Sequence, residues 1–170
     1  MTEQVIIEPL GDHDRDGFSC GVEPLDRYFR QQVTQDVRRY LTNCFVAVGA
    51  DSGILAGYFT FAASSIALDD LPADETKRLP RYRALPAGLI GRLVVDIHFR
   101  KRGVGSVLLA DAAKRARQAT PAVFALLVDA KDDAAIAFYR HHGFAALQSE
   151  PRRLFLPVAS AARLFATPRR

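Results

Sequence analysis

The sequence predicts a single mixed α/β domain spanning residues 1–170. Strand-like runs fill much of the first half, and the second half alternates strand, helix, strand, helix and strand, an order typical of one sheet flanked by helices. The chain is 49% hydrophobic and 25% charged, which is ordinary for a globular domain and sufficient for a buried core. Since no internal repeat, low-complexity tract or linker interrupts the pattern, we expect one domain.

The first half opens with a short strand over residues 4–9 and a polar, glycine-bounded loop over 11–17. A helix is predicted over 23–40, because Pro24 stands near its start, where a missing N–H costs nothing. Apolar residues also recur there at every fourth position, namely Leu25, Phe29, Val33, Val37 and Leu41.

Two β-rich runs, 43–49 and 54–66, flank the triplet Asp51-Ser52-Gly53, which predicts a hairpin. Residues 67–86 contain three prolines and no sustained periodicity, so we expect a long loop that can hold a short helix. A loop of this length inside a compact domain is usually functional.

The second half begins with a strand over 89–96, a glycine turn and a helix over 105–118. The apolar run 123–130 predicts a buried strand. A helix follows from Asp132 to Arg140, with Asp132 or Asp133 as its N-cap and Gly143 just beyond its end. The runs 144–148 and 152–158 predict two closing strands.

The stretch FRKRGVGSVLLADAAKRA, residues 99–116, has the parts of an anion-binding turn. The first N–H groups of a helix have no partner within it and point outward with the positive end of the helix dipole, where phosphate oxygens bind readily. Gly103 and Gly105 are expected to adopt positive φ and to let the main chain approach a ligand. Three cations add countercharge: Arg100, Lys101 and Arg102. The alternative is a glycine turn with a solvated basic edge, but the strand before it and the helix after it favour the anion site.

Cations gather locally although the net charge is only +4. Such clusters favour a polyanionic partner, and a solvated basic face is the alternative for any one of them. The clusters are Arg27, Arg30, Arg38 and Arg39, then Lys77, Arg78, Arg81 and Arg83, then residues 100–102.

Charges, Gly or Pro interrupt every apolar run well before the roughly 18 residues of a membrane span, and MTEQVIIEPL lacks the pattern of a secretion signal. We therefore expect a cytoplasmic protein without a membrane span. Cys20 and Cys44 are too few for a disulfide scaffold and are not spaced as a metal pair, so free thiols and no metal site are expected.

Two segments, LVVDIHFRKRGVGSVLLADA and VDAKDDAAIAFYRHHGF, resemble the central motifs of the GNAT acyl-CoA N-acyltransferases, and the likeness spans most of the chain. The resemblance implies a GNAT fold, with a mixed, mainly antiparallel sheet of six to seven strands flanked by helices, and acetyl-CoA as acyl donor. It implies that the turn holds the coenzyme A pyrophosphate and that the strand before it pairs its backbone with the pantetheine arm. The residues implied for cofactor binding are Leu93, Val94, Val95, Arg100, Lys101, Arg102, Gly103, Val104, Gly105, Ser106, Asp132 and Phe138.

The same resemblance implies that Tyr139 is the general acid that protonates the departing thiolate. A phenol with a pKa near 10 suits that step in a dry site; a helix residue packing its ring on the sheet is the alternative. Asp132 stands where the family usually has Asn, and an N-cap role suits Asp equally well.

A narrower resemblance covers FSCGVEPLDRYFRQQVTQDVRR, GYFTFAASSI, LPRYRALPAGLIGRLVVD and RLFLPV. These segments are similar to the TacT-type GNAT toxins of bacterial toxin-antitoxin pairs. That family implies acetylation of the α-amine of aminoacyl-tRNA, a ribbon-helix-helix antitoxin as partner, a homodimer, and operator DNA bound only through the antitoxin complex. The cations expected to contact tRNA are Arg30, Arg38, Arg39, Lys77, Arg78, Arg81, Arg83 and Arg92.

An α-amine titrates at about 7.7 to 8.0, far below lysine, so part of it is neutral and nucleophilic at cell pH. The sequence offers no convincing base, since Glu23 lies in the first helix and Asp96 can cap the turn; water-mediated deprotonation is the hypothesis. Direct attack then forms an oxyanion that a backbone N–H near Val94 or Val95 is expected to stabilise.

Other functions remain open at this stage. Within acyl transfer, the alternative is a GNAT enzyme that acts on a protein lysine or a small amine, and outside enzymes it is a nucleic-acid-binding module. The sequence argues against a dinucleotide oxidoreductase, because the glycine-rich fingerprint of that class needs glycine where Leu108 stands. A Cys-His hydrolase lacks a local nucleophile signature, and a metal site at His141 and His142 lacks further ligands at suitable spacing.

Overall fold

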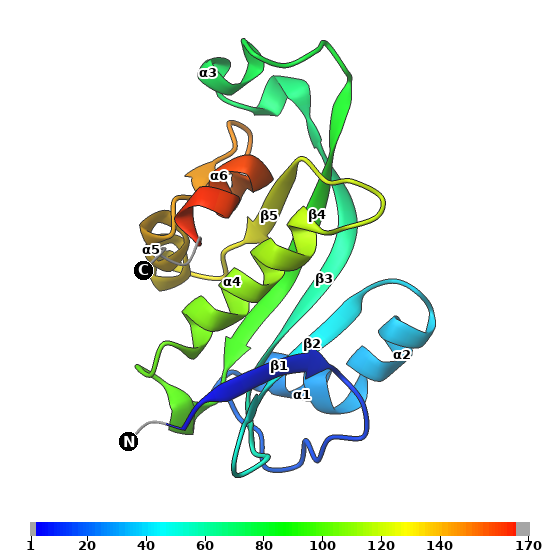
Figure 1. Cartoon of the computed structure of the whole chain (residues 1–170), viewed down its shortest axis with the longest axis vertical. Helices are drawn as coiled ribbons and strands as arrows, with labels where there is room; N and C mark the ends of the chain where they lie inside the picture. The colour runs from blue at the N-terminus through cyan, green and yellow to red at the C-terminus, as the bar shows by residue number, and fades with distance from the viewer. Residues whose placement is uncertain (1–2, 166–170) are drawn as a thin grey trace. The chain divides into compact units, whose positions relative to one another are not determined.

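The computed structural model describes residues 3–165, and its seven strands form a sheet in the order β1-β2-β3-β4-β5-β7-β6 (Figure 1). The pairs β1–β2, β2–β3, β5–β7 and β6–β7 are antiparallel, and β4–β5 is parallel. The predicted fold class, a mixed and mainly antiparallel sheet with flanking helices, is confirmed. The strands are β1 (Val5–Pro9), β2 (Asn43–Gly49), β3 (Leu55–Ala67), β4 (Ala84–Val95), β5 (Ala125–Asp129), β6 (Ala145–Ala146) and β7 (Arg153–Pro157).

Contacts divide the chain into two compact units, Met1–Ala62 with Gly91–Asp111, and Ala63–Ile90 with Ala112–Arg170. Each unit therefore combines segments that are far apart in the sequence, because β3, β4 and α4 (Val104–Arg117) run through both. The expectation of one domain over 1–170 stays a prediction. None of the helices between residues 3 and 165 combines the length and apolar character needed to cross a bilayer.

The first unit has an aromatic core beneath α1 (Glu23–Gln31) and α2 (Val33–Arg38). Phe29 stacks on Tyr58 with ring centroids 4.2 Å apart. Gly57 permits the close approach of β3 to β4, since a Cβ there would lie 2.6 Å from the carbonyl oxygen of Val94. The predicted hairpin is confirmed by the antiparallel pairing of β2 with β3.

The single helix predicted over 23–40 is wrong in one respect, because the backbone leaves helical geometry at Gln32 (φ −122°, ψ −35°). The break lies between Phe29 and Val33, which are both fully buried in the same core cluster. The four-residue apolar spacing survives the break, so periodicity alone does not reveal it. Figure 1 shows the two short helices beside β1 and β2.

The second unit has its core around Ile66, Leu71, Leu127 and Phe155. The predicted loop is confirmed over residues 68–83, where it contains two short helical turns, η1 (Leu68–Asp70) and α3 (Ala73–Thr76). Its predicted ends are wrong, because residue 67 belongs to β3 and residues 84–86 belong to β4. Asp70 fixes the loop, since its carboxylate accepts hydrogen bonds from the Ser149 N–H at 2.7 Å and the Ser149 hydroxyl at 2.8 Å.

Two boundaries and one helix in this unit differ from the sequence prediction. β4 begins at Ala84 rather than near residue 89, and β6 is limited to Ala145–Ala146. The helix α6 (Val158–Leu164) was not predicted. It follows β7 without a connecting loop, directly after Pro157, and packs on β5 and β7.

Candidate functional site

The turn between β4 and α4 has the left-handed backbone expected of an anion site, though at partly different residues. Lys101 (φ 61°) and Gly103 (φ 79°) have positive φ. Gly105 is instead the second residue of α4, so the prediction of positive φ there is wrong. No atom lies within 4 Å of a Cβ built on Gly103, so backbone conformation, rather than crowding, favours glycine at that position.

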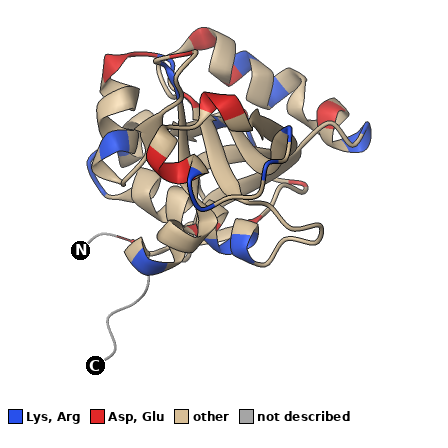
Figure 2. Ribbon diagram, turned by 90° about the horizontal axis from the view of Figure 1, so that it is seen from above, with Lys and Arg blue, Asp and Glu red and all other residues tan. Residues whose placement is uncertain are grey.

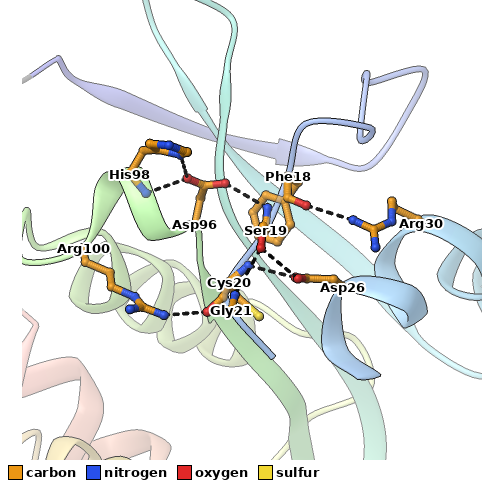
Figure 3. A network of polar contacts seen from close by, with 9 residues as sticks. All are labelled: Phe18, Ser19, Cys20, Gly21, Asp26, Arg30, Asp96, His98 and Arg100. Carbon is orange, nitrogen blue, oxygen red and sulfur yellow. Dashed lines mark hydrogen bonds and ion pairs between the residues drawn. The ribbon is translucent and has the colours of Figure 1, made fainter. Parts of the chain in front are cut away.

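Asp96 holds the start of this turn, as the sequence suggested. Asp96 is only 3% exposed. Its Oδ1 accepts a hydrogen bond from the N–H of His98 at 2.8 Å and so caps the short turn η2 (Ile97–Phe99). The other oxygen, Oδ2, accepts from the Ser19 N–H at 3.1 Å. One buried carboxylate thus joins the turn to the segment before α1 (Figure 3).

Asp26 completes this connection, and sequence reasoning missed it. Its buried carboxylate accepts from the Cys20 N–H at 2.9 Å and from the Ser19 hydroxyl at 3.1 Å. The only sequence signal was an acidic residue in the first turn of a helix, which ordinarily indicates a solvent-exposed contribution to the dipole. In Figure 3 the residues 18–21 lie between Asp26 and Asp96.

Two predicted ligand-binding arginines donate to the same segment. Arg100 donates from Nη2 to the carbonyl oxygen of Cys20 at 2.6 Å, and Arg30 donates from Nη1 to that of Phe18 at 3.1 Å. At least one N–H of each guanidinium therefore fixes protein backbone. We define Phe18–Gly21 with Asp26, Asp96 and Arg100 as the clamp (Figure 3).

The residues of the turn fit a diphosphate. The fourteen-residue helix α4 begins at Val104, directly after Gly103, so its first N–H groups face away from the helix body. Lys101 and Arg102 are exposed, and Ser106 lies in the first helical turn. Arg102 also lies over the Phe99 ring, with its guanidinium carbon 5.4 Å from the ring centroid.

The end of β4 offers backbone for a further strand. The register of β4 with β5 covers Ala87–Ile90, and among the described residues it pairs none of 91–95 with β5. Val94 is buried in the aromatic core, while Leu93 and Val95 are half-buried. The three residues predicted to meet the pantetheine arm thus belong to this part of β4.

Tyr139 lies on α5 (Asp133–His141) and is 6% exposed, with its ring against those of Phe138 and Phe144. Burial raises the pKa of its phenol above the ordinary value, and the charge of Asp129 raises the pKa further. Its hydroxyl has no hydrogen-bond partner among the described residues, and none of their fully buried side-chain polar atoms lacks one. The hydroxyl therefore reaches accessible surface and stays protonated at neutral pH.

Two neighbouring predictions concern α5. Asp132 is confirmed as its N-cap, because its side chain accepts from the Ala135 N–H at 2.8 Å. Phe138 is half-buried, with its ring 4.6 Å from that of His142. A cofactor contact by Asp132 or Phe138 stays a prediction.

Arg92 lies in a cleft of about 410 Å³. Its guanidinium carbon is 3.4 Å from the centroid of the Tyr28 ring, so one face of the guanidinium is stacked. Tyr28 is fixed in turn, since its hydroxyl donates to Asp36 at 2.9 Å. The lining residues are Pro24, Arg27, Tyr28, Gln31, Gln32, Gln35 and Arg92.

The remaining cations predicted to contact tRNA are all exposed. Within residues 3–165 none of them forms an ion pair or a hydrogen bond through its side chain. They occur in both units, and Figure 2 shows blue Lys and Arg segments on helices and on loops. They are Arg38, Arg39, Lys77, Arg78, Arg81 and Arg83.

The order of strands, the basic turn before α4 and the buried tyrosine on α5 correspond to a known family. The sequence model of the acetyltransferase (GNAT) family matches residues 14–144 of this chain. The chain belongs to the GNAT acetyltransferases. It is therefore an N-acetyltransferase with acetyl-CoA as its acyl donor, as the sequence motifs predicted.

Two relatives match almost the whole GNAT chain. One, from Sinorhizobium fredii, is named a probable toxin TacT and is 31% identical over 91% of this chain and 92% of its own. The other, from Mycobacterium tuberculosis, is named a tRNA-acetylating toxin. It is 34% identical over 89% of this chain and 90% of its own length.

Solved structures agree with these relatives. AtaT complexed with acetyl-methionyl-tRNAfMet is 27% identical, with a TM-score of 0.87 over 96% of this chain and 100% of AtaT. AtaTR bound with AcCoA is 26% identical, with a TM-score of 0.81 over 96% and 99%. The KacTA–DNA complex is 27% identical, with a TM-score of 0.77 over 95% and 98%.

Proposed function

We propose that this chain is a toxin of a toxin-antitoxin pair that acetylates the α-amine of aminoacyl-tRNA and thereby blocks translation. The observation that carries the proposal is the 34% identity to a tRNA-acetylating toxin over 89% of the chain. The exposed cations without ion pairs support a polyanionic substrate, because each is available to neutralise a phosphate.

The proposed partners follow from the resemblance to the TacT-type toxins. We infer a ribbon-helix-helix antitoxin that covers the toxin, a homodimer, and operator DNA reached only through the antitoxin complex. A structure of the relative KacTA with DNA supports the last point. We also propose that the protein acts in the cytoplasm, where charged tRNA is found.

The proposed cofactor residues divide by the part of coenzyme A that they hold. The turn Arg100–Gly105 and Ser106 hold the diphosphate through main-chain N–H groups and the exposed cations Lys101 and Arg102. Leu93, Val94 and Val95 offer backbone to the pantetheine arm. One N–H of the Arg100 guanidinium is held by the protein, because it donates to the carbonyl oxygen of Cys20.

Acetyl-CoA supplies a thioester whose carbonyl carbon an amine attacks directly, with loss of the coenzyme A thiolate. An α-amine needs little help in losing its proton, since its pKa is about 7.7 to 8.0. Tyr139 donates the proton that the leaving group requires. Burial disfavours the tyrosinate in this environment, and it also makes an adjacent thiolate more basic, so proton transfer to that thiolate remains feasible.

The deciding experiment is incubation of the protein with acetyl-CoA and a pool of charged tRNA, followed by mass analysis of the released aminoacyl groups. We expect acetylated α-amines on one or a few amino acids. A lysine-containing peptide and a set of small amines serve as competitors in the same reaction. Preferential acetylation of these competitors would show that the chain is a GNAT enzyme of another substrate class.

A further inference from the structure

An exposed tyrosine follows α2 in a backbone conformation that disfavours it. Tyr40 has φ 59° and is 96% exposed. Its N–H donates to the Val37 carbonyl at 3.1 Å, and the N–H of Leu41 donates to the Asp36 carbonyl at 3.0 Å. These two bonds complete a helix C-terminal motif whose left-handed position is usually glycine, because a side chain is strained there.

The fold gains little from the Tyr40 side chain. A ring that is 96% exposed removes almost no apolar surface from water. Among the described residues it has no ring contact and no side-chain hydrogen bond. The Tyr40 backbone completes the helix end, but its side chain adds strain and stabilises nothing in the fold, which points to a binding role for the ring.

The charges beside this ring indicate the kind of ligand. Arg38 and Arg39 immediately precede Tyr40, are exposed, and have no ion pair within the part of the chain that the structure describes. Unpaired RNA bases are recognised by stacking on aromatic rings while nearby cations contact the phosphates. Leu41 is also exposed, but two uncompensated cations favour a nucleic acid over an apolar protein surface.

We propose that Tyr40 stacks on an unpaired base of the RNA substrate, with Arg38 and Arg39 contacting the neighbouring phosphates. The ligand is an unpaired or terminal nucleotide, because the bases of a duplex are already stacked on one another. This inference rests on the proposed function, since it assigns one contact of the tRNA.

Three substitutions separate the ring from the backbone strain. Tyr40→Phe keeps both, Tyr40→Ala removes the ring, and Tyr40→Gly removes the ring and the strain. We expect uncharged tRNA, measured by fluorescence anisotropy, to bind Tyr40→Phe as it binds the wild type and to bind the Ala and Gly variants about tenfold more weakly. Tyr40→Gly should nevertheless melt about 2 °C higher than the wild type.

In Tyr40→Gly the tRNA affinity should fall while the melting temperature rises. This combination indicates a binding role, because loss of a purely structural side chain would lower both. Arg38→Gln is the electrostatic control and should lower the slope of log affinity against log salt by about one. Tyr40→Gly should leave that slope unchanged. It should weaken binding of a single-stranded RNA oligonucleotide but not of a duplex with the same sequence.

Wild-type affinity of Tyr40→Gly and Tyr40→Ala for tRNA and for the single strand would overturn the proposal. So would retained tRNA affinity with an altered elution volume or weakened antitoxin binding, because Tyr40 would then contact protein. These readouts need no acetyl transfer, so they are independent of whether the wild type acetylates charged tRNA.

Discussion

Tyr139 is the residue on which the proposed chemistry depends, and its phenol can be tested apart from its ring. Tyr139→Phe keeps the contacts with Phe138 and Phe144 and removes only a hydroxyl that has no hydrogen-bond partner among the described residues. We expect turnover to fall by about a hundredfold or more, because general-acid catalysis is lost. The melting temperature and the dissociation constant of acetyl-CoA, from calorimetry, should change little.

Tyr58→Phe is the matched control, because it makes the same chemical change at another buried tyrosine. The Tyr58 hydroxyl donates to the Leu25 carbonyl at 3.0 Å, so its loss should lower the melting temperature by about 2–4 °C and leave turnover intact. Unchanged turnover of Tyr139→Phe would remove the general-acid role.

Residue types were easier to predict than their partners. The basic turn, Tyr139 and the N-cap Asp132 each stand at a spacing that a local motif requires. The clamp instead joins residues 77 and 80 positions apart, Ser19 with Asp96 and Cys20 with Arg100. No local pattern in the sequence reveals such pairs, and Arg100 was therefore predicted as a ligand cation alone.

At the scale of elements, the clamp connects α1 to the turn before α4. Asp26→Ala removes the acceptor for the Cys20 N–H and the Ser19 hydroxyl at a position that is 3% exposed. We expect a loss of stability of about 1–3 kcal/mol, seen as a melting temperature lower by several degrees. The affinity for acetyl-CoA should also fall, because Arg100 then holds a segment that is no longer fixed.

Glu23→Ala on the same helix is the control for Asp26→Ala. Its side chain is 65% exposed, and its contacts with Arg27 and Arg30 are 3.8 Å and 3.9 Å long, so the change should cost less than about 0.5 kcal/mol. Equal effects of the two substitutions on melting temperature would show that Asp26 does not act through the clamp.

Elements were predicted well where a boundary residue accompanies the pattern. The hairpin has Gly53 and α5 has Asp132, and both were located correctly. The helix α6 does begin after a boundary residue, Pro157, but its seven residues are too few to show a helical periodicity. The break at Gln32 has no such residue, because the packing of Val33, which is fully buried, decides it. Packing of this kind follows from the completed sheet and not from neighbouring residues.

At the scale of the whole molecule, burial of weak acids sets the response of the fold to alkali. Burial raises the pKa of Cys44 from 9.0 to about 12. Burial, with a hydrogen bond to Asp36, raises the pKa of Tyr28 from 10.0 to about 12. Tyr58 and Tyr139 shift in the same direction, again chiefly because of burial.

These shifts predict a loss of stability as pH rises. Each group keeps its proton more tightly in the folded chain, so above about pH 9 the unfolded chain binds fewer protons than the native one, and the free energy of unfolding then decreases. The stabilisation is complete below pH 9 and is lost towards pH 12, first through Cys44 and then through the tyrosines.

Denaturant unfolding at pH 8, 9.5, 10.5 and 11.5, with tyrosinate absorbance followed in parallel, measures this dependence. Wild-type stability should decline across the series, and Tyr58→Phe should decline less steeply above pH 10, by up to about 1.4 kcal/mol per pH unit for one proton. Because lysines titrate equally in both proteins, the difference between the two slopes isolates Tyr58. Identical slopes would mean that this phenol ionises as readily in the folded chain as in the unfolded one, contrary to its buried position between Phe18 and Phe29.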